Sequence, residues 1–263
     1  MNKRIEVIMA PDYRRHSSYQ SSLSEALVNQ DVEVNFLSNY KRIFPLARGV
    51  RRIPGHLMHM HWPEAYFQRK PYWKRELRKL RFILDLHRVV MRMSLVFTAH
   101  NLTPHNREDE ALVEQLYQRL FSLAGGVFVH SQYQKKVLLE AYRVESERVH
   151  VIPHEDLSSE MLPPLRQIDA RERLNLNASD KICLMFGLIS PYKEIDGIMR
   201  SWNVEIMQGT QLHVVGAVSH GEYTRYLKDL CASCEGVHLH LANNWVPSGE
   251  LRNWLFAADC VLF

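Results

Sequence analysis

The sequence lacks any long hydrophobic run. A transmembrane helix needs about 20 consecutive apolar residues, whereas the longest apolar runs of this 263-residue chain, such as Ile182–Ile189, are far shorter. The N-terminal segment MNKRIEVIMAPDYRR becomes polar too early for a signal peptide. We therefore expect neither a membrane-spanning segment nor an export signal.

Cysteines and metal-ligating patterns are also scarce. The 4 cysteines all lie in the second half of the chain, too few and too one-sided for a disulfide scaffold, so we expect a cytoplasmic protein. His56, His59 and His61 resemble a metal cluster, but no acidic residue or cysteine has a matching spacing. Nucleic-acid binding would require aromatic platforms or a recognisable fold, and the sequence shows neither. The sequence predicts no bound metal and no nucleic-acid partner.

Charge is present in ordinary amount but is unevenly distributed. Residues 1–154 hold 24 Lys and Arg against 15 Asp and Glu, a net charge of +9. Residues 155–263 hold 9 against 14, a net charge of −5. The alternation of apolar runs pauses over 155–167, which contains Pro163 and Pro164. Two domains joined by a linker give such a split, so we predict domains at 1–154 and 155–263.

Short apolar runs alternate with longer segments of helical period in both halves. This pattern predicts an α/β fold with a mostly parallel sheet in each domain. Ser131 and Gln134 form the capping-box pattern of a helix start. Strands are predicted at 5–10, 32–37, 57–61, 95–100, 127–130, 149–153, 181–186, 211–215, 237–241 and 260–263. Helices are predicted at 18–29, 71–93, 107–124, 132–142, 191–202, 221–232 and 248–257.

One histidine occupies a position where ligands bind in folds of this class. His100 ends the predicted strand 95–100, and ligands of open α/β sheets collect at the carboxyl ends of strands. Its imidazole can hydrogen-bond a sugar or a leaving group. The alternative is a loop histidine that only caps the strand.

The segment after the strand at 181–186 predicts an anion site. Ser190 suits the N-cap and Pro191 the first turn of a helix, whose free amides would bind a phosphate together with Lys193. In the alternative, Glu194 and Asp196 complement the helix dipole and neutralise the lysine.

The predicted helix at 71–93 carries most of the excess positive charge of the first half. Its apolar positions recur at steps of three and four residues and predict a face packed on the core. Its basic side is either solvated or faces anionic lipid headgroups. The apolar positions are Trp73, Leu77, Leu80, Leu84, His87 and Met91, and the candidates for a membrane-facing role are Arg75, Arg78, Lys79 and Arg81.

Five segments, in order, resemble one enzyme family: HWPE at 61–64, TAHNLTPH at 98–105, VHS at 129–131, VIPH at 151–154 and FGLISPYK at 186–193. Together they are similar to retaining group-1 glycosyltransferases of family 4. The resemblance implies a GT-B architecture, in which two Rossmann-like domains face a cleft. It also implies transfer from a nucleoside-diphosphate sugar with retention, without a tightly bound metal or other cofactor. The chain has no Asp-x-Asp pair, the usual diphosphate-metal motif of the other main glycosyltransferase architecture.

The resemblance also assigns roles to individual residues. His100 would be catalytic, beside the reacting sugar. The second domain would hold the donor nucleotide, with donor-binding residues Gly187, Ser190, Lys193 and His154. The first domain would hold the acceptor, with candidates His61, Trp62, Glu64 and Asn101.

Three departures from the family pattern bear on activity. Ser190 stands where members commonly have arginine, and Glu155 where they commonly have glycine. The Glu-x7-Glu motif and the C-terminal helix would follow Phe263, so we expect a C-terminally truncated chain whose second domain is incomplete.

Three functions remain open at this point. The leading one is sugar transfer to a saccharide or lipid-linked acceptor in polysaccharide biosynthesis, at the cytoplasmic membrane surface. The second is a catalytically impaired homologue that binds a nucleotide sugar or a partner protein. The third is a sugar-nucleotide epimerase of the same fold, which would need no lipid acceptor.

Overall fold

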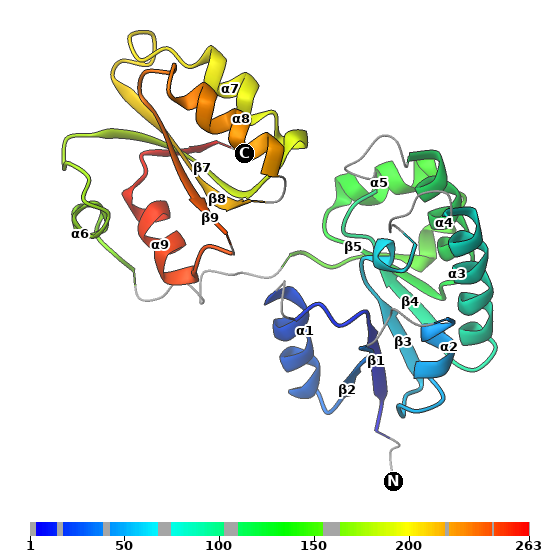
Figure 1. Ribbon diagram of the computed structural model, residues 1–263. Helices are drawn as coiled ribbons and strands as arrows, with labels where there is room; N and C mark the ends of the chain where they lie inside the picture. Colours follow the sequence, from blue (N-terminus) through cyan, green and yellow to red (C-terminus); the bar gives the residue numbers. More distant parts are fainter. Residues whose placement is uncertain are drawn as a thin grey trace. The chain divides into compact units, whose positions relative to one another are not determined.

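A computed structural model describes residues 4–14, 18–38, 43–67, 75–102, 110–154, 164–218, 221–243 and 245–262. Contacts between Cα atoms divide the chain into two compact units, Met1–Glu155 and Asp156–Phe263. Each unit contains one parallel β-sheet with helices packed against it (Figure 1). The predicted α/β class with parallel sheets is therefore confirmed.

The first unit is built on a six-stranded parallel sheet of order β2-β1-β3-β4-β5-β6. Neighbours pair in register, for example Ile8 of β1 with Met58 of β3. Side chains of its inner strands are buried almost continuously, as expected for a parallel sheet covered on both faces. The strands are β1 (Glu6–Ala10), β2 (Glu33–Phe36), β3 (Leu57–Met60), β4 (Ser94–Thr98), β5 (Gly126–Val129) and β6 (Val149–Val151).

Helices cover both faces of this sheet. Figure 1 shows α1 on one face and α2, α3 and α4 on the other. The main core lies under the second group, where Phe82, Leu86 and Leu120 pack on strand residues such as Phe97. The helices are α1 (Ser18–Val28), α2 (Pro45–Gly49), α3 (Arg75–Val90), α4 (Glu110–Leu123) and α5 (Gln132–Ala141), with 3-10 turns at Pro63–Tyr66 and Ser146–Arg148.

The second unit has a four-stranded parallel sheet of order β10-β7-β8-β9. One face packs on α7 and α8 through Met199 and Leu227, and the other on α9 through Trp254. Arg171 of α6 donates to the Ala257 carbonyl at the end of α9. The strands are β7 (Lys181–Ile189), β8 (Thr210–Val218), β9 (Val237–Ala242) and β10 (Cys260–Leu262). The helices are α6 (Gln167–Arg173), α7 (Ile195–Ser201), α8 (Gly221–Cys231) and α9 (Ser248–Ala257).

Every predicted strand is found, with ends displaced by a few residues at most, but one predicted helix is wrong in part. The segment 191–202 does not form a single helix from Pro191. A 3-10 turn at Pro191–Lys193 is followed by Glu194 in the left-handed conformation (φ 51°), and α7 begins only at Ile195. Ser190 makes no side-chain cap bond there. Two short helices, α2 and α6, were not predicted.

The buried face of α3 also differs from the prediction. Leu77, Leu80 and Leu84 are 46%, 54% and 42% exposed. The face that packs on the sheet instead carries Phe82 and Leu86 together with other buried residues. The apolar stripe predicted to pack on the core therefore faces outward, because a second apolar set with the same helical spacing meets the sheet.

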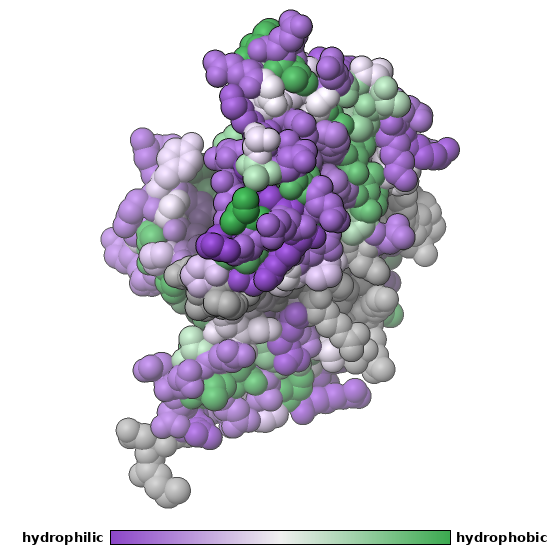
Figure 2. Space-filling view, turned by 90° about the vertical axis from the view of Figure 1, so that its left-hand side faces the viewer, coloured by the Kyte–Doolittle hydropathy of each residue, from purple (hydrophilic) through white to green (hydrophobic). Residues whose placement is uncertain are grey.

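The surface is mixed in character. In Figure 2, hydrophilic side chains cover most of the face shown, and hydrophobic residues show between them, as is ordinary for a folded domain. Among the residues that the structure describes, no helix has the length and apolar character needed to cross a membrane.

Candidate functional site

Four histidines gather at the carboxyl edge of the first sheet. His61 follows β3, His100 follows β4, His130 follows β5 and His154 follows β6. Parallel strands end at the same edge, so residues that follow adjacent strands become neighbours although they are far apart in sequence. The ring centroids of His61 and His100 lie 5.4 Å apart, those of His100 and His130 5.2 Å, and those of His130 and His154 4.8 Å.

Hydrogen bonds join three of these rings into a relay that ends on the backbone. Nδ1 of His130 lies 3.0 Å from the carbonyl oxygen of Ile152, its Nε2 lies 3.3 Å from Nδ1 of His100, and Nε2 of His100 lies 3.1 Å from Nδ1 of His61. A carbonyl only accepts, and a neutral imidazole has one N–H. The bond to Ile152 therefore fixes every tautomer, with each ring donating through Nδ1 and accepting through Nε2.

The relay leaves one polar atom unsatisfied. His61 is fully buried, and its Nε2 has no hydrogen-bond partner in the described structure. By the tautomer argument this atom is an acceptor. A buried acceptor without a donor costs free energy. The unsatisfied Nε2 of His61 therefore lowers the stability of the folded first unit slightly.

Burial keeps the relay neutral. It lowers the pKa of His100 to about 3 and the pKa of His61 well below its ordinary value, and neighbouring histidines add to both effects. Burial also lowers the pKa of His130, against the opposing hydrogen bond to Ile152. At neutral pH all three rings are uncharged and keep the proton pattern derived above.

Aromatic rings enclose His100. Trp62 stacks on it with centroids 4.0 Å apart and planes 10° apart. Tyr19 of α1 meets its edge at 4.8 Å and also contacts His61, His130 and Trp62. Tyr19 was not predicted as a site residue, because nothing in its local pattern separates it from an ordinary helical tyrosine.

The side chain of Gln134 holds the backbone of His100, although the sequence predicted only a helix-capping role for this residue. Ser131 accepts from the amide of Gln134 as predicted, but the Gln134 side chain accepts from the amide of His130 instead of Ser131. Its NH2 group donates to the carbonyls of Ala99 and His100 at 3.1 and 3.0 Å. Gln134 therefore fixes the loop after β4 to the start of α5.

The remaining acceptor-side candidates lie in the same unit. Glu64, in the 3-10 turn after Trp62, accepts a hydrogen bond from the hydroxyl of Tyr117. Burial first, and then Glu64, raises the pKa of Tyr117. Asn101 directly follows His100 and is partly buried. Glu155 lies outside the described residues.

In the second unit, Gly187 and Lys193 are in close contact. Lys193 Nζ donates to the Phe186 carbonyl at 3.1 Å, and burial lowers its pKa. Gly187 has φ 114°, and a Cβ there would lie 2.9 Å from Nζ. Ser190 is 6% exposed. The predicted α-helix start at Pro191 is wrong, because a 3-10 turn begins there, and the phosphate site itself stays a prediction.

The predicted donor-binding residues fall into both units. Gly187, Ser190 and Lys193 lie at the end of β7 in the second unit. His154 lies in the first unit, where its ring contacts His130 and Tyr19. The structure thus groups His154 with the histidine relay.

The basic candidates of α3 whose side chains are described differ in exposure. Lys79 is 21% exposed, lies 3.7 Å from Glu76 and donates to Gln115 of α4. Arg78 is partly buried, Arg81 is exposed, and the side chain of Arg75 lies outside the described residues. Arg81 lies beside the exposed leucines around the helix.

The histidine cluster is not arranged as a metal centre. The hydrogen-bonded ring nitrogens of the cluster point to each other, to Ile152 or to Thr98, which lies 2.7 Å from His59, whereas Nε2 of His61 has no partner in the described structure. Across the described part of the chain, no three His, Cys, Asp or Glu side chains are grouped in a way that could hold a metal ion.

Solved structures with a similar fold include nucleotide-sugar enzymes. Anabaena Alr3699/HepE, in complex with UDP and glucose, matches with a TM-score of 0.64 and 13% identity over 98% of this chain and 73% of that one. A glycosyltransferase from Rickettsia africae matches with a TM-score of 0.58 and 14% identity over 99% and 73%. A putative UDP-N-acetylglucosamine 2-epimerase from Listeria monocytogenes matches with a TM-score of 0.57 and 11% identity over 98% and 74%.

Sequence comparison gives a more specific result. No curated protein sequence matches the chain, but a family profile does, and it covers residues 16–154. This range spans more than half of the chain and includes the whole histidine relay. The solved structures, at 11–14% identity, show a shared fold. The chain belongs to Glycosyltransferase Family 4.

Proposed function

We propose that this protein transfers a sugar from a nucleoside-diphosphate donor, with retention, to a saccharide or lipid-linked acceptor in polysaccharide biosynthesis. The observation that carries the proposal is the neutral histidine relay at the carboxyl edge of the first sheet, centred on His100. The fold likeness to HepE, solved with UDP and glucose, supports the donor class. No tightly bound cofactor is required, because the nucleotide sugar is the co-substrate.

In this proposal His100 binds the reacting sugar. The transition state resembles an oxocarbenium ion, so positive charge grows on the sugar ring as the bond to the diphosphate breaks. A protonated imidazole would oppose that charge. His100, whose pKa is held at about 3, instead offers a neutral ring, and a sugar hydroxyl can replace one of its two histidine partners.

The second domain, 155–263, would bind the donor nucleotide. Lys193 would stabilise the leaving diphosphate, Gly187 would let the backbone approach it, and Ser190 would contribute a hydroxyl in place of the usual arginine. Lys193 is already partly desolvated and must exchange its bond to the Phe186 carbonyl for one to phosphate. His154, in the first domain, is the fourth donor-binding candidate.

The first domain, 1–154, would hold the acceptor, with His61, Trp62, Glu64 and Asn101 at its carboxyl edge. A lipid-linked acceptor would place the protein on the inner face of the cell membrane. Arg75, Arg78, Lys79 and Arg81 would then contribute to peripheral binding at an anionic surface.

Nucleotide binding tests the donor site. Calorimetric titration with UDP should show that Lys193→Ala weakens binding by about 1.5–3 kcal/mol, the range of a charge-assisted hydrogen bond. Lys181→Ala is the matched control, because Lys181, at the start of β7, also donates to a backbone carbonyl, that of Gln208, at 3.1 Å. Equal UDP affinity in the two variants would remove Lys193 from the site.

Product analysis separates the three candidate functions. Transfer or hydrolysis releases UDP from UDP-glucose, whereas an epimerase keeps UDP attached to a sugar of changed configuration. The fold likeness to a putative epimerase favours testing UDP-N-acetylglucosamine in parallel. UDP binding without either product would support the impaired homologue. His100→Ala should abolish turnover while the circular dichroism spectrum stays that of the parent.

A further inference from the structure

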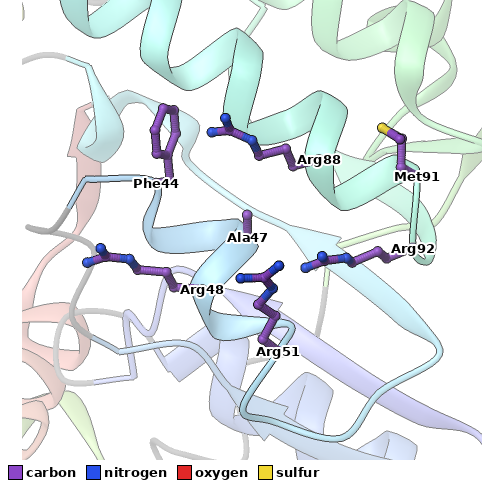
Figure 3. A pocket seen from close by; sticks show the side chains of 7 residues that line it. All are labelled: Phe44, Ala47, Arg48, Arg51, Arg88, Met91 and Arg92. Carbon is purple, nitrogen blue, oxygen red and sulfur yellow. The ribbon is translucent and has the colours of Figure 1, made fainter.

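A pocket lined by arginines lies between α2 and the end of α3. Its volume is about 390 Å³. Figure 3 shows that its side chains come from α2 and the turn after it on one side and from the end of α3 on the other. The lining residues are Phe44, Ala47, Arg48, Arg51, Arg88, Met91 and Arg92.

The charge of this pocket is poorly compensated. Within the described structure, none of its four guanidinium groups forms a hydrogen bond or an ion pair with another residue. Arg88 lies over the ring of Phe44, 4.0 Å from its centroid. In Figure 3 the guanidinium groups of Arg51 and Arg92 point toward each other. Two like charges in such an arrangement repel, and an anion between them would remove the repulsion.

A buried carboxylate that interacts with these arginines, that of Asp85, already accepts two other hydrogen bonds. Asp85 is 1% exposed and accepts hydrogen bonds from the amides of Leu46 and Ala47, each at 2.9 Å, which hold α2 against α3. Burial raises its pKa, while Arg88 and Arg48 oppose that shift. One buried carboxylate beside four guanidinium groups leaves the pocket with about three uncompensated positive charges.

The pocket is separate from the histidine relay. Arg92 precedes β4 and His100 follows it, so the pocket lies toward the amino edge of the sheet and the relay at the carboxyl edge. A donor or acceptor bound at His100 therefore does not account for the arginines.

An exposed apolar ridge runs along the same helix. Leu77, Leu80 and Leu84 fall within about 60° of one another around α3 at 3.6 residues per turn. Met91, 83% exposed, continues the ridge past the helix end and also lines the pocket. An apolar ridge beside a row of arginines is typical of helices that lie in the surface of an anionic bilayer. The ridge and the pocket thus point to one occupant.

We propose that this pocket binds the phosphate group of an anionic lipid headgroup, with the ridge of α3 entering the boundary between headgroups and acyl chains. Planar guanidinium groups suit phosphate because they donate two parallel hydrogen bonds to its oxygens. The choice of a lipid as the source of the phosphate rests on the membrane association proposed above. The proposal does not depend on nucleotide-sugar turnover.

Vesicle sedimentation tests the proposal. The protein should sediment with vesicles that contain phosphatidylglycerol and not with pure phosphatidylcholine vesicles. Arg51→Gln/Arg92→Gln should weaken binding about 30-fold, taking about 1 kcal/mol for each basic residue. Lys136→Gln/Arg143→Gln removes the same charge from exposed positions of the same unit and should have a much smaller effect. Equal losses in the two variants would show that only net charge matters and would overturn the pocket.

Inorganic pyrophosphate distinguishes a lipid from a soluble source. Its binding is measured calorimetrically in a Lys193→Ala background, so that the proposed donor site does not contribute. Leu80→Gln should weaken vesicle binding but leave pyrophosphate binding unchanged, because Leu80 belongs to the ridge and does not line the pocket. Pyrophosphate binding that needs Arg51 and Arg92, without any vesicle binding, would overturn the lipid source and assign a soluble phosphate. The Arg51→Gln/Arg92→Gln variant should bind UDP with the affinity of the parent. Unchanged UDP affinity would show that the pocket and the proposed donor site bind their ligands independently.

Discussion

Protonation of His59 should destabilise the first unit below neutral pH. His59 of β3 is 7% exposed, its Nε2 lies 2.7 Å from the Thr98 hydroxyl, and its ring packs on His61 and Phe128. Burial lowers its pKa from 6.5 to about 4. The informative change is His59→Gln, because the glutamine amide can reach the Thr98 hydroxyl but cannot be protonated.

The sign and size follow from linkage. The folded pKa lies below the unfolded one, so between them the unfolded chain binds the extra proton, and stability falls as pH falls. The loss approaches about 1.4 kcal/mol per pH unit below 6.5. From pH 7 to pH 5, His59 should therefore remove about 2 kcal/mol of unfolding free energy, and His59→Gln should lose that much less.

The assay must read the first unit alone. Urea unfolding at pH 7 and pH 5, followed by pulsed hydrogen exchange at the amides of β3 and β4, does so. His150→Gln is the control, because it makes the same replacement at an exposed histidine of β6. A parent and a His59→Gln variant with the same difference between pH 7 and pH 5 would refute the argument from burial.

Two further substitutions test local geometry. Gly187→Ala should destabilise the second unit by about 1–3 kcal/mol in thermal unfolding, because φ is 114° and the new Cβ would lie 2.9 Å from Lys193 Nζ. Gly197→Ala is the control, because this glycine lies in α7 and its Cβ would have no neighbour within 4 Å. That change should be neutral or stabilising. Ser131→Ala should cost about 0.5–2 kcal/mol in urea unfolding through loss of the bond from the Gln134 amide, and an unchanged midpoint would contradict that cap.

Strands were the most predictable part of this fold. In a sheet covered on both faces each strand is a short run of apolar residues, as in VIMA at 7–10 and CLMFG at 183–187, bounded by polar turns. Such runs are local, so the sequence alone locates them. The short helices α2 and α6 have no such local pattern. At five and seven residues they are too brief to show a helical period, and contacts such as Asp85 with Leu46 stabilise them from a distance.

The orientation of α3 shows a different limit. Apolar residues at steps of three and four occur on two sides of this helix, one containing Leu80 and Leu84 and the other Phe82 and Leu86. Periodicity identifies the helix but cannot choose between two apolar faces. The choice is made by the sheet and by Asp85, which shares the buried side because it bonds the amides of α2. A hydrophobicity pattern assigns Asp85 to the solvent-facing side of the helix, although it is buried.

The grouping of the four histidines could be predicted from the sequence, but their tautomers could not. His61, His100 and His130 end predicted strands and His154 directly follows one, and parallel strands bring such positions to one edge. Their assembly therefore depends only on strand order. The proton pattern does not, because it depends on Nδ1 of His130 lying 3.0 Å from the Ile152 carbonyl and on the burial that keeps every ring neutral. A change that frees that one carbonyl would release the tautomers of His130 and then of His100, so the geometry of a single backbone oxygen controls the site.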